Sequence, residues 1–295
     1  MGQRVALSGS DDSARVIQAW NTVLFEKFLR FRHLVSTGLS AHSDAFFRRA
    51  PFAQGARVLD VGCGFGDTTL QIAELVGKAG SAVGVDCSER FIELGRKDAA
   101  ATRFANVSFR VADAQTADLG GPYEHIFSRF GTMFFSAPGA ALRNLRRCLA
   151  PGGTLALIVW RRREDNGWLY EAEQCVKRWV PVVSHEETDQ AHCGPGPFSM
   201  ASADLVSQLL LSAGFEEIGF ERLDRPVCIG KDLREAVEFA LALGPAGEIL
   251  RLAGETSEAL NAKVRAELAE TLRAFERPDG VWGPSSAWLV TAKNP

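Results

Sequence analysis

The chain has 295 residues, of which 46% are hydrophobic and 23% charged, so it can bury a large core. Its formal net charge of −3 disfavours strong electrostatic attraction to nucleic acid or to an anionic membrane. No apolar run approaches the roughly 20 residues that span a bilayer, and no signal-peptide core follows the first residues. We therefore expect a cytoplasmic protein without nucleic-acid or membrane partners.

The first fifty residues predict an amphipathic helix followed by a shorter one. Asp11 and Asp12 are candidate N-caps, and the shorter helix should span residues 41–49 and end before Pro51. The first helix either packs statically on the rest of the chain or forms part of a lid over a ligand site. Its apolar stripe consists of Val16, Trp20, Val23, Leu24, Phe28, Phe31 and Val35.

A strand, a glycine-rich loop and a helix follow. Residues 58–61 form a short apolar run typical of a buried parallel strand, and a helical pattern begins at Asp67. Between them, Gly62, Gly64 and Gly66 allow positive φ angles and a close approach of the backbone to a ligand. This arrangement directs a helix N-terminus and free amides at whatever lies above the loop.

The next strands also end in acidic or small residues. The strand at residues 82–85 ends in Asp86, at about the distance from a glycine loop where α/β folds bind a ribose hydroxyl pair. Asp86 could instead only cap the helix that begins near Ser88. The strand at residues 107–112 precedes Asp113 and Ala114. Further strands are expected at residues 125–128 and 154–160.

The spacing Asp60-x-G-x-G-x-G differs from the dinucleotide fingerprint G-x-G-x-x-G, which disfavours a dehydrogenase. It resembles the first motif of the class I S-adenosylmethionine-dependent methyltransferases. The helix, Pro-Gly-Gly turn and strand over residues 145–160 resemble the same superfamily, and the whole chain looks like a group of bacterial small-molecule methyltransferases. The resemblance implies an α/β fold with a Rossmann-like, doubly wound, seven-stranded sheet. Its sixth strand would span residues 215–223, and its seventh, residues 287–292, would be antiparallel.

The resemblance implies S-adenosyl-L-methionine as cofactor and S-adenosyl-L-homocysteine as product. In this pattern Asp113 faces the adenine amino group and the following amide faces a ring nitrogen. The predicted cofactor-binding residues are Asp60, Gly62, Cys63, Gly64, Gly66, Asp86, Cys87, Asp113, Ala114 and Ser128. No metal is expected, because the six cysteines lack zinc spacing and read as reduced thiols.

The expected organisation is a sheet-based core interrupted by helical insertions that close the acceptor pocket. The units are an N-terminal helical lid (1–50), the core (51–160), a lid insertion (161–200), the core continued (201–230), a helical insertion (231–280) and the final core strand (281–295). The second insertion should contain a helix opened by a capping box, Asp232-x-x-Glu235.

The expected function is methyl transfer to an O, N or S atom of a small organic acceptor. Methyl transfer requires alignment of the acceptor and exclusion of water, and a base only where the acceptor is protonated. Candidate bases are His33 and His192, whereas His125 lies in a strand and is expected to be structural. The alternative is a methyltransferase-like regulatory or scaffold protein that binds the cofactor without transfer. The predicted substrate pocket consists of Trp20, Phe130, Met133, Phe134 and Phe198.

Overall fold

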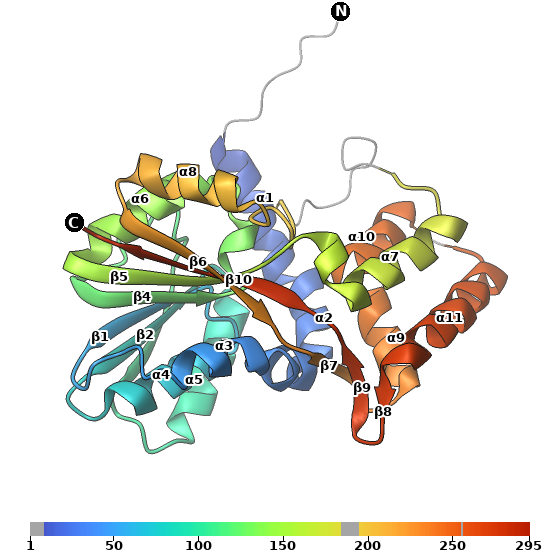
Figure 1. The fold of residues 1–295 in the computed structure, drawn as a ribbon, viewed down its shortest axis with the longest axis horizontal. Coiled ribbons are helices and arrows are strands. Elements are labelled where there is room, and N and C mark those ends of the chain that lie inside the picture. The colour runs from blue at the N-terminus through green and yellow to red at the C-terminus, as the bar shows by residue number, and fades with distance from the viewer. Residues whose placement is uncertain (1–8, 184–194, 255) are drawn as a thin grey trace, which may run out of the picture.

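The computed structural model describes residues 9–183, 195–254 and 256–295 and is built around a seven-stranded mixed sheet (Figure 1). Its last strand in the sequence runs antiparallel to both of its neighbours. The predicted fold class is therefore confirmed. In spatial order the strands are β3 (Val107–Val111), β2 (Ser81–Asp86), β1 (Arg57–Val61), β4 (Tyr123–Arg129), β5 (Leu149–Trp160), β10 (Ser286–Lys293) and β6 (Glu216–Asp224).

Helices cover both faces of this sheet, as Figure 1 shows. One face carries α3 (Ser40–Phe47), α4 (Asp67–Val76) and α5 (Glu89–Ala100), and the other carries α6 (Pro138–Cys148) and α8 (Ala203–Ala213). The ends of α8 follow from its sequence. Ser202 accepts a hydrogen bond from the backbone N–H of Leu205, and Gly214 ends the helix in the left-handed conformation.

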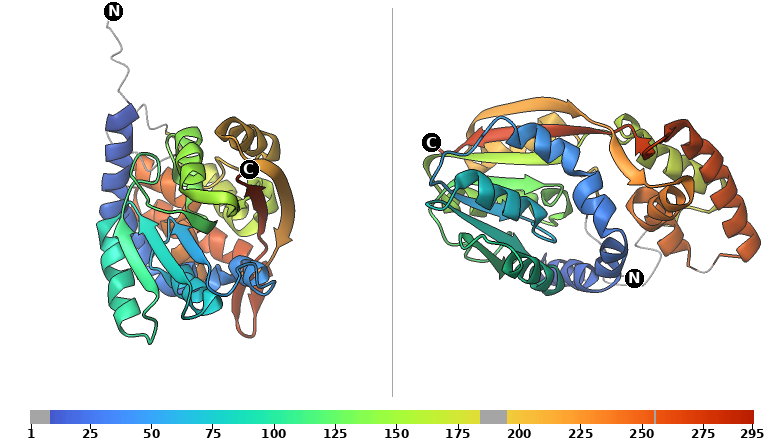
Figure 2. Two further views of the ribbon diagram at one scale, coloured as in Figure 1. Left: turned by 90° about the vertical axis from the view of Figure 1, so that its left-hand side faces the viewer. Right: turned by 90° about the horizontal axis from the view of Figure 1, so that it is seen from below.

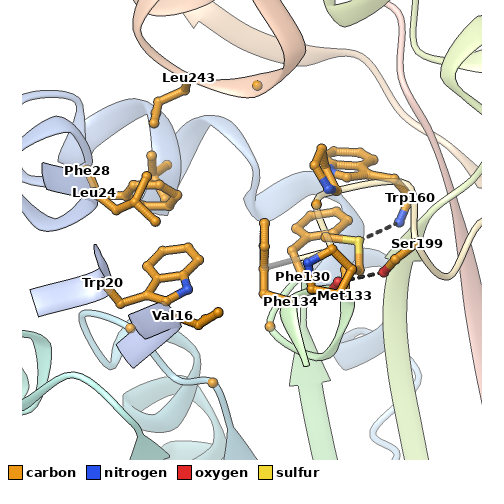
Figure 3. Close-up of a pocket in the computed structure, with 18 of the residues that line it drawn as sticks. Val16, Trp20, Leu24, Phe28, Phe130, Met133, Phe134, Trp160, Ser199 and Leu243 are labelled. Carbon is orange, nitrogen blue, oxygen red and sulfur yellow. Dashed lines mark hydrogen bonds between the residues drawn. The ribbon is translucent and has the colours of Figure 1, made fainter. Parts of the chain in front are cut away.

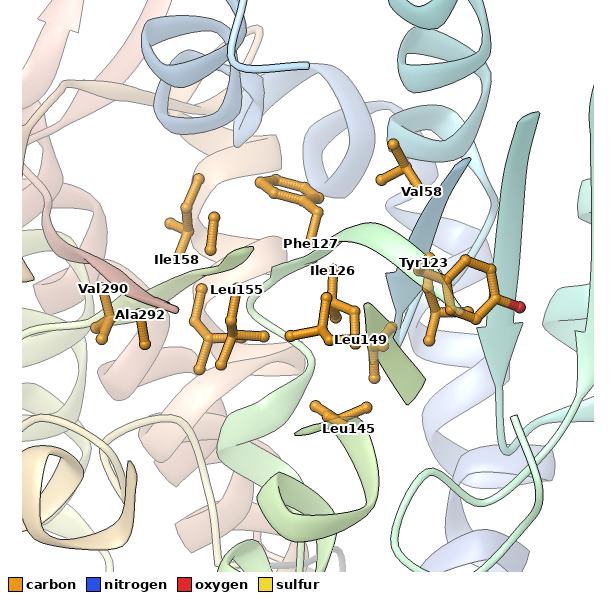
Figure 4. Close-up of a cluster of buried hydrophobic side chains, with 14 of the residues drawn as sticks. Val58, Tyr123, Ile126, Phe127, Leu145, Leu149, Leu155, Ile158, Val290 and Ala292 are labelled. Carbon is orange, nitrogen blue, oxygen red and sulfur yellow. The ribbon is translucent and has the colours of Figure 1, made fainter. Parts of the chain in front are cut away.

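The core lies where the alternating side chains of β4 meet these two helical layers. Ile126 and Phe127 are fully buried on opposite faces of the strand (Figure 4). The ring of Phe127 lies 5.7 Å and 4.9 Å from those of Phe46 and Phe47 on α3, whereas Leu145 of α6 lies on the opposite side of the strand. Both faces of the sheet are therefore buried, and this burial fixes the register of the strands that carry the site.

A second, mostly helical part lies at one end of the large sheet (Figures 1 and 2). Half of the predicted capping box is present, because the N-cap Asp232 accepts the N–H of Glu235, whereas Glu235 accepts the N–H of Lys231, one residue before the N-cap. The three short strands of this part were not predicted, because they have too few residues to show an alternation of apolar and polar side chains. The part comprises α7 (Gly167–Trp179), α9 (Leu233–Ala242), α10 (Gly244–Ala253), α11 (Glu258–Leu272), the one-turn helices η3 (Arg163–Asp165) and η5 (Arg273–Phe275), and a sheet of β7 (Val227–Gly230), β9 (Gly280–Gly283) and β8 (Glu276–Arg277).

The N-terminal segment is not the single helix that its apolar stripe predicts. It consists of α1 (Gly9–Asn21), α2 (Val23–Arg30) and a π-helical turn, η1 (Leu34–Gly38), interrupted at Thr22. Thr22 leaves helical geometry at φ −123° and ψ −100°, and its hydroxyl donates to a carbonyl one turn earlier. The predicted caps were wrong, because α1 already runs through Asp11 and Asp12. Among the residues described, no helix is both long and apolar enough to cross a membrane.

Candidate active site

The glycine loop between β1 and α4 has three positive φ angles, but its glycines serve different purposes. A Cβ on Gly62 would lie 2.9 Å from the backbone of Gly131, and one on Gly66 would lie 2.5 Å from the ring of Phe109. These two positions need glycine for close packing inside the protein. A Cβ on Gly64, at φ +52°, would meet no protein atom within 4 Å. The middle glycine therefore borders open space, as a cradle for a ligand requires.

Asp86, at the carboxyl end of β2, ties this loop to the start of α5. Its carboxylate accepts the backbone N–H of Gly64 at 3.0 Å and that of Ser88 at 2.9 Å. Burial raises the pKa of Asp86, and these backbone donors act in the opposite direction. Asp86 therefore both caps α5 and lies beside the glycine loop, so its two expected roles do not exclude each other. A carboxylate has further lone pairs, so it can still accept a hydroxyl from a ligand.

A cavity of about 840 Å³ begins at this loop and extends between the sheet edge, the N-terminal helices and the second part (Figure 3). Asp113 and Arg129 line it with the loop, and the opposite walls are mostly apolar or aromatic. The structure brings together every predicted substrate-pocket residue, since Trp20, Phe130, Met133, Phe134 and Phe198 all line this cavity.

The cavity also contains most of the predicted cofactor residues. Burial raises the pKa of both Cys63 and Cys87, so neither thiol is a nucleophilic thiolate at neutral pH. The predicted residues that line the cavity are Gly62, Cys63, Gly64, Asp86, Cys87, Asp113 and Ala114.

Three predicted cofactor residues, Asp60, Gly66 and Ser128, do not line the cavity. Asp60 accepts the hydroxyls of Thr68 and Thr69, both at 2.7 Å, and so holds the first turn of α4. Burial raises the pKa of Asp60 to about 6. Ser128 donates to the carbonyl of Val61 on the adjacent strand at 2.7 Å. These side chains support the loop from behind, which argues against the direct ligand contact expected of them.

Helix α1 lies against the predicted adenine position. The hydroxyl of Ser13 donates to Asp113 at 3.0 Å, and the other carboxylate oxygen of Asp113 accepts from Gln115. Further along α1, the indole of Trp20 meets the ring of Phe134 edge-on at 5.0 Å and that of Phe28 at 5.3 Å (Figure 3). The N-terminal helices therefore form one wall of the cavity.

The histidines offer no base within the described cavity. The side chain of His33 is 58% exposed, bonds Glu235 at 3.1 Å and lies outside the cavity, which argues against a catalytic role. His192 falls outside the described residues. His125 bonds the hydroxyl of Thr154, in keeping with the expected structural role. His42 is buried behind Phe130, and burial lowers its pKa to about 3, so it is neutral.

The sequence analysis predicted Asp86 and Asp113 but missed other charged side chains that line the cavity. Arg129 and Asp67 form an ion pair of 2.6 Å at the loop end. Glu173, on α7, is buried and accepts from Arg163 at 2.6 Å and from Lys177 at 2.7 Å. Its other oxygen, Oε2, has no hydrogen-bond partner in the described part of the chain. Within those same residues, no cluster of three or more His, Cys, Asp or Glu side chains could hold a metal ion.

Residues 53–191 match the family described as "Methyltransferase domain". The chain is 26% identical, over 58% of its length and 70% of the relative's, to the ubiquinone/menaquinone biosynthesis C-methyltransferase UbiE of Azotobacter vinelandii. It is 31% identical to the demethylmenaquinone methyltransferase of Shouchella clausii over 35% of this chain and 45% of that protein.

Two solved structures share the fold at low sequence identity. The YcgJ protein from Bacillus subtilis superposes with a TM-score of 0.55 at 16% identity, over 85% of this chain and 96% of that one. Haemonchus contortus phosphoethanolamine N-methyltransferase 2, solved with phosphomonomethylethanolamine and S-adenosylhomocysteine, has a TM-score of 0.53 at 17% identity, over 96% of this chain and 58% of that one.

Proposed function

We propose that this chain is an S-adenosylmethionine-dependent methyltransferase that methylates a small, largely apolar, ring-bearing acceptor; the match of residues 53–191 to the methyltransferase domain supports this. One observation carries the proposal. A single cavity joins the open glycine loop, Asp86 and Asp113 to walls of aromatic side chains. A methyl donor and an apolar acceptor can therefore meet in one water-poor space.

The residues at the loop end fit the cofactor. The space beside Gly64 is free of protein atoms, the Asp86 carboxylate borders it, and Asp113 supplies a second acceptor further along. Gly62, Gly64, Asp86 and Asp113 would hold S-adenosylmethionine there. When bound, it supplies an electrophilic methyl group on a positively charged sulfur. The protein is then required to orient the acceptor and to keep water out.

The aromatic walls of the cavity keep water away from the methyl group. Phe130 and Trp160 stack with their ring centroids 3.9 Å apart, and both meet the buried ring of His42 edge-on. Because His42 is held neutral by burial, this wall carries no charge that would attract water. Trp20 lies across from Phe130 on the N-terminal helix, and its ring meets that of Phe134 (Figure 3). A flat apolar ring is the acceptor shape that such walls favour.

The acceptor end of the cavity also includes a buried carboxylate, Glu173, which is our candidate for the base. Glu173 is fixed by Arg163 and Lys177 through one oxygen, and Oε2 lacks a partner within the described residues. A ring hydroxyl that loses its proton to Glu173 becomes nucleophilic at oxygen and at the adjacent ring carbon. Carbon therefore joins O, N and S as a candidate acceptor atom, and the similarity to the C-methyltransferase UbiE of Azotobacter vinelandii favours it.

Transfer of an isotopically labelled methyl group to a panel of hydroquinones, phenols, amines and thiols tests the proposal. Mass spectrometry of the products identifies the methylated atom. We expect label on hydroxylated rings and its loss in Glu173→Gln, with S-adenosylhomocysteine binding unchanged. Cofactor binding without transfer to any member of the panel would instead favour a regulatory or scaffold protein.

A further inference from the structure

Phe130, the first residue after β4, has a backbone conformation that a bulky side chain rarely adopts. Its φ is +59°, in the left-handed region. Two other non-glycine residues in the described part of the chain have a positive φ, Ala50 and Glu217, and both are exposed. Phe130 is instead half-buried and lines the cavity. Backbone strain of this kind persists where the surrounding structure enforces it, and it is concentrated at functional sites.

Three contacts hold Phe130 in this conformation. Its backbone N–H donates to the carbonyl of Ile158 on β5 at 2.8 Å. Its ring stacks on that of Trp160, on the same strand, with the centroids 3.9 Å apart and the planes 18° apart. The ring of His42 lies 5.6 Å from that of Phe130 and 5.4 Å from that of Trp160. Because these two distances are nearly equal, His42 lies beside the stack and leaves the other face of Phe130 uncovered.

The next residue brings this ring close to the glycine loop. A Cβ on Gly131 would lie 3.0 Å from the Cα of Gly62 and 3.0 Å from the carbonyl oxygen of Val61, so the two backbones are in direct contact. Gly62 is the first glycine of the loop assigned to S-adenosylmethionine. Since Phe130 is bonded to Gly131, this backbone contact sets the position of its ring relative to a bound methyl donor.

We infer that Phe130 determines which acceptors are accepted, because its uncovered face is the surface on which a planar acceptor ring stacks. This inference deepens the proposed function and rests on it. Trp160 covers one face of the ring, and an acceptor in the cavity reaches the other (Figure 3). Offset stacking favours flat rings, and a puckered saturated ring of the same size cannot make it. The strained backbone holds the ring where this contact lies next to the glycine loop.

Calorimetry with two ring compounds tests the stacking role. The probes are 2-naphthol, which is planar, and decahydro-2-naphthol, which has the same carbon skeleton and hydroxyl position but puckered rings. With S-adenosylhomocysteine bound, the unaltered protein should bind 2-naphthol about three- to tenfold more tightly. Phe130→Leu should lose most of this preference while its affinity for S-adenosylhomocysteine stays unchanged. The change between the two proteins is decisive, because the two hydroxyls also differ in acidity.

Thermal unfolding tests the strain independently of any ligand. Phe130→Ala and Phe130→Gly both remove the ring, but only glycine adopts φ +59° without strain. Phe130→Gly should therefore melt higher than Phe130→Ala, by roughly 2–4 °C. Equal melting temperatures would show that the backbone is unstrained and would overturn the inference. Phe130→Gly also serves as the second variant without the ring if Phe130→Leu does not fold.

Phe52→Leu provides the matched control, because Phe52 is buried among core aromatics and does not line the cavity. It should keep the preference for 2-naphthol. An unchanged preference in Phe130→Leu or Phe130→Gly would overturn the stacking role. Failure of the unaltered protein to bind either ring compound, although S-adenosylhomocysteine binds, would instead refute the ring-bearing acceptor of the proposed function, and the role of Phe130 with it.

Discussion

A valine at Gly64 should abolish cofactor binding while the protein still folds. Because a Cβ at this position meets no protein atom within 4 Å, the folded protein bears only the cost of φ +52°. That cost is roughly 1–2 kcal/mol for a residue with a side chain. For a domain of this size it lowers the melting temperature by roughly 2–8 °C. The branched side chain would then fill the space assigned to the ligand.

Gly152 is the matched control. It has φ +74°, and a Cβ there would also meet nothing within 4 Å, but it lies near the start of β5 and does not line the cavity. Gly152→Val and Gly64→Val should therefore lose similar stability in thermal unfolding. In calorimetry only Gly64→Val should lose S-adenosylhomocysteine affinity, by at least about a hundredfold, or ~2.7 kcal/mol. If folded Gly64→Val binds as tightly as the control, the loop is a turn and not a cradle.

Three further outcomes are expected. Asp86→Ala should weaken S-adenosylmethionine and S-adenosylhomocysteine roughly ten- to a hundredfold, and unchanged calorimetric affinity would remove Asp86 from the site. Because burial lowers the pKa of His42 from 6.5 to about 3, its neutral form stabilises the fold above pH 6.5, and this contribution is lost as the pH falls toward 3. Urea unfolding should show a loss of up to about 5 kcal/mol across that range, missing in His42→Gln; parallel pH profiles would refute this account. Residues 15–35 should exchange amide hydrogen more slowly with S-adenosylhomocysteine present if the N-terminal helices are a lid, and equal exchange would mean static packing.

The large sheet was predictable because its strands are recognisable locally. The central strands are short apolar runs, and those of the loop side end in glycines or in an acid such as Asp86 or Asp113. The aromatic wall was also predictable, since Phe130, Met133 and Phe134 directly follow β4. Their convergence with Trp20 required the N-terminal helices to fold over that edge, which the amphipathic stripe indicated without determining.

The features that could not be predicted from the sequence depend on contacts between distant segments. The stripe continues across Thr22, so periodicity alone gives no sign that the helix breaks there. Arg129 ends strand β4 and Asp67 begins helix α4. The sequence gives no sign that they meet, because only the folded sheet brings their side chains to 2.6 Å. Glu173 carried no signal, because its environment is created by α7 packing beside the cavity.

The place of β10 has a consequence for how the protein is made in the cell. It follows every other strand in the sequence, yet it lies between β5 and β6, and β6 has no other partner in the sheet. During synthesis β5 must therefore wait with an unpaired edge until residues 286–293 have been translated. An open edge can pair with other chains. A chain interrupted before Ser286 should thus be a target for chaperones, and delayed closure makes the sheet's completion a late event in folding.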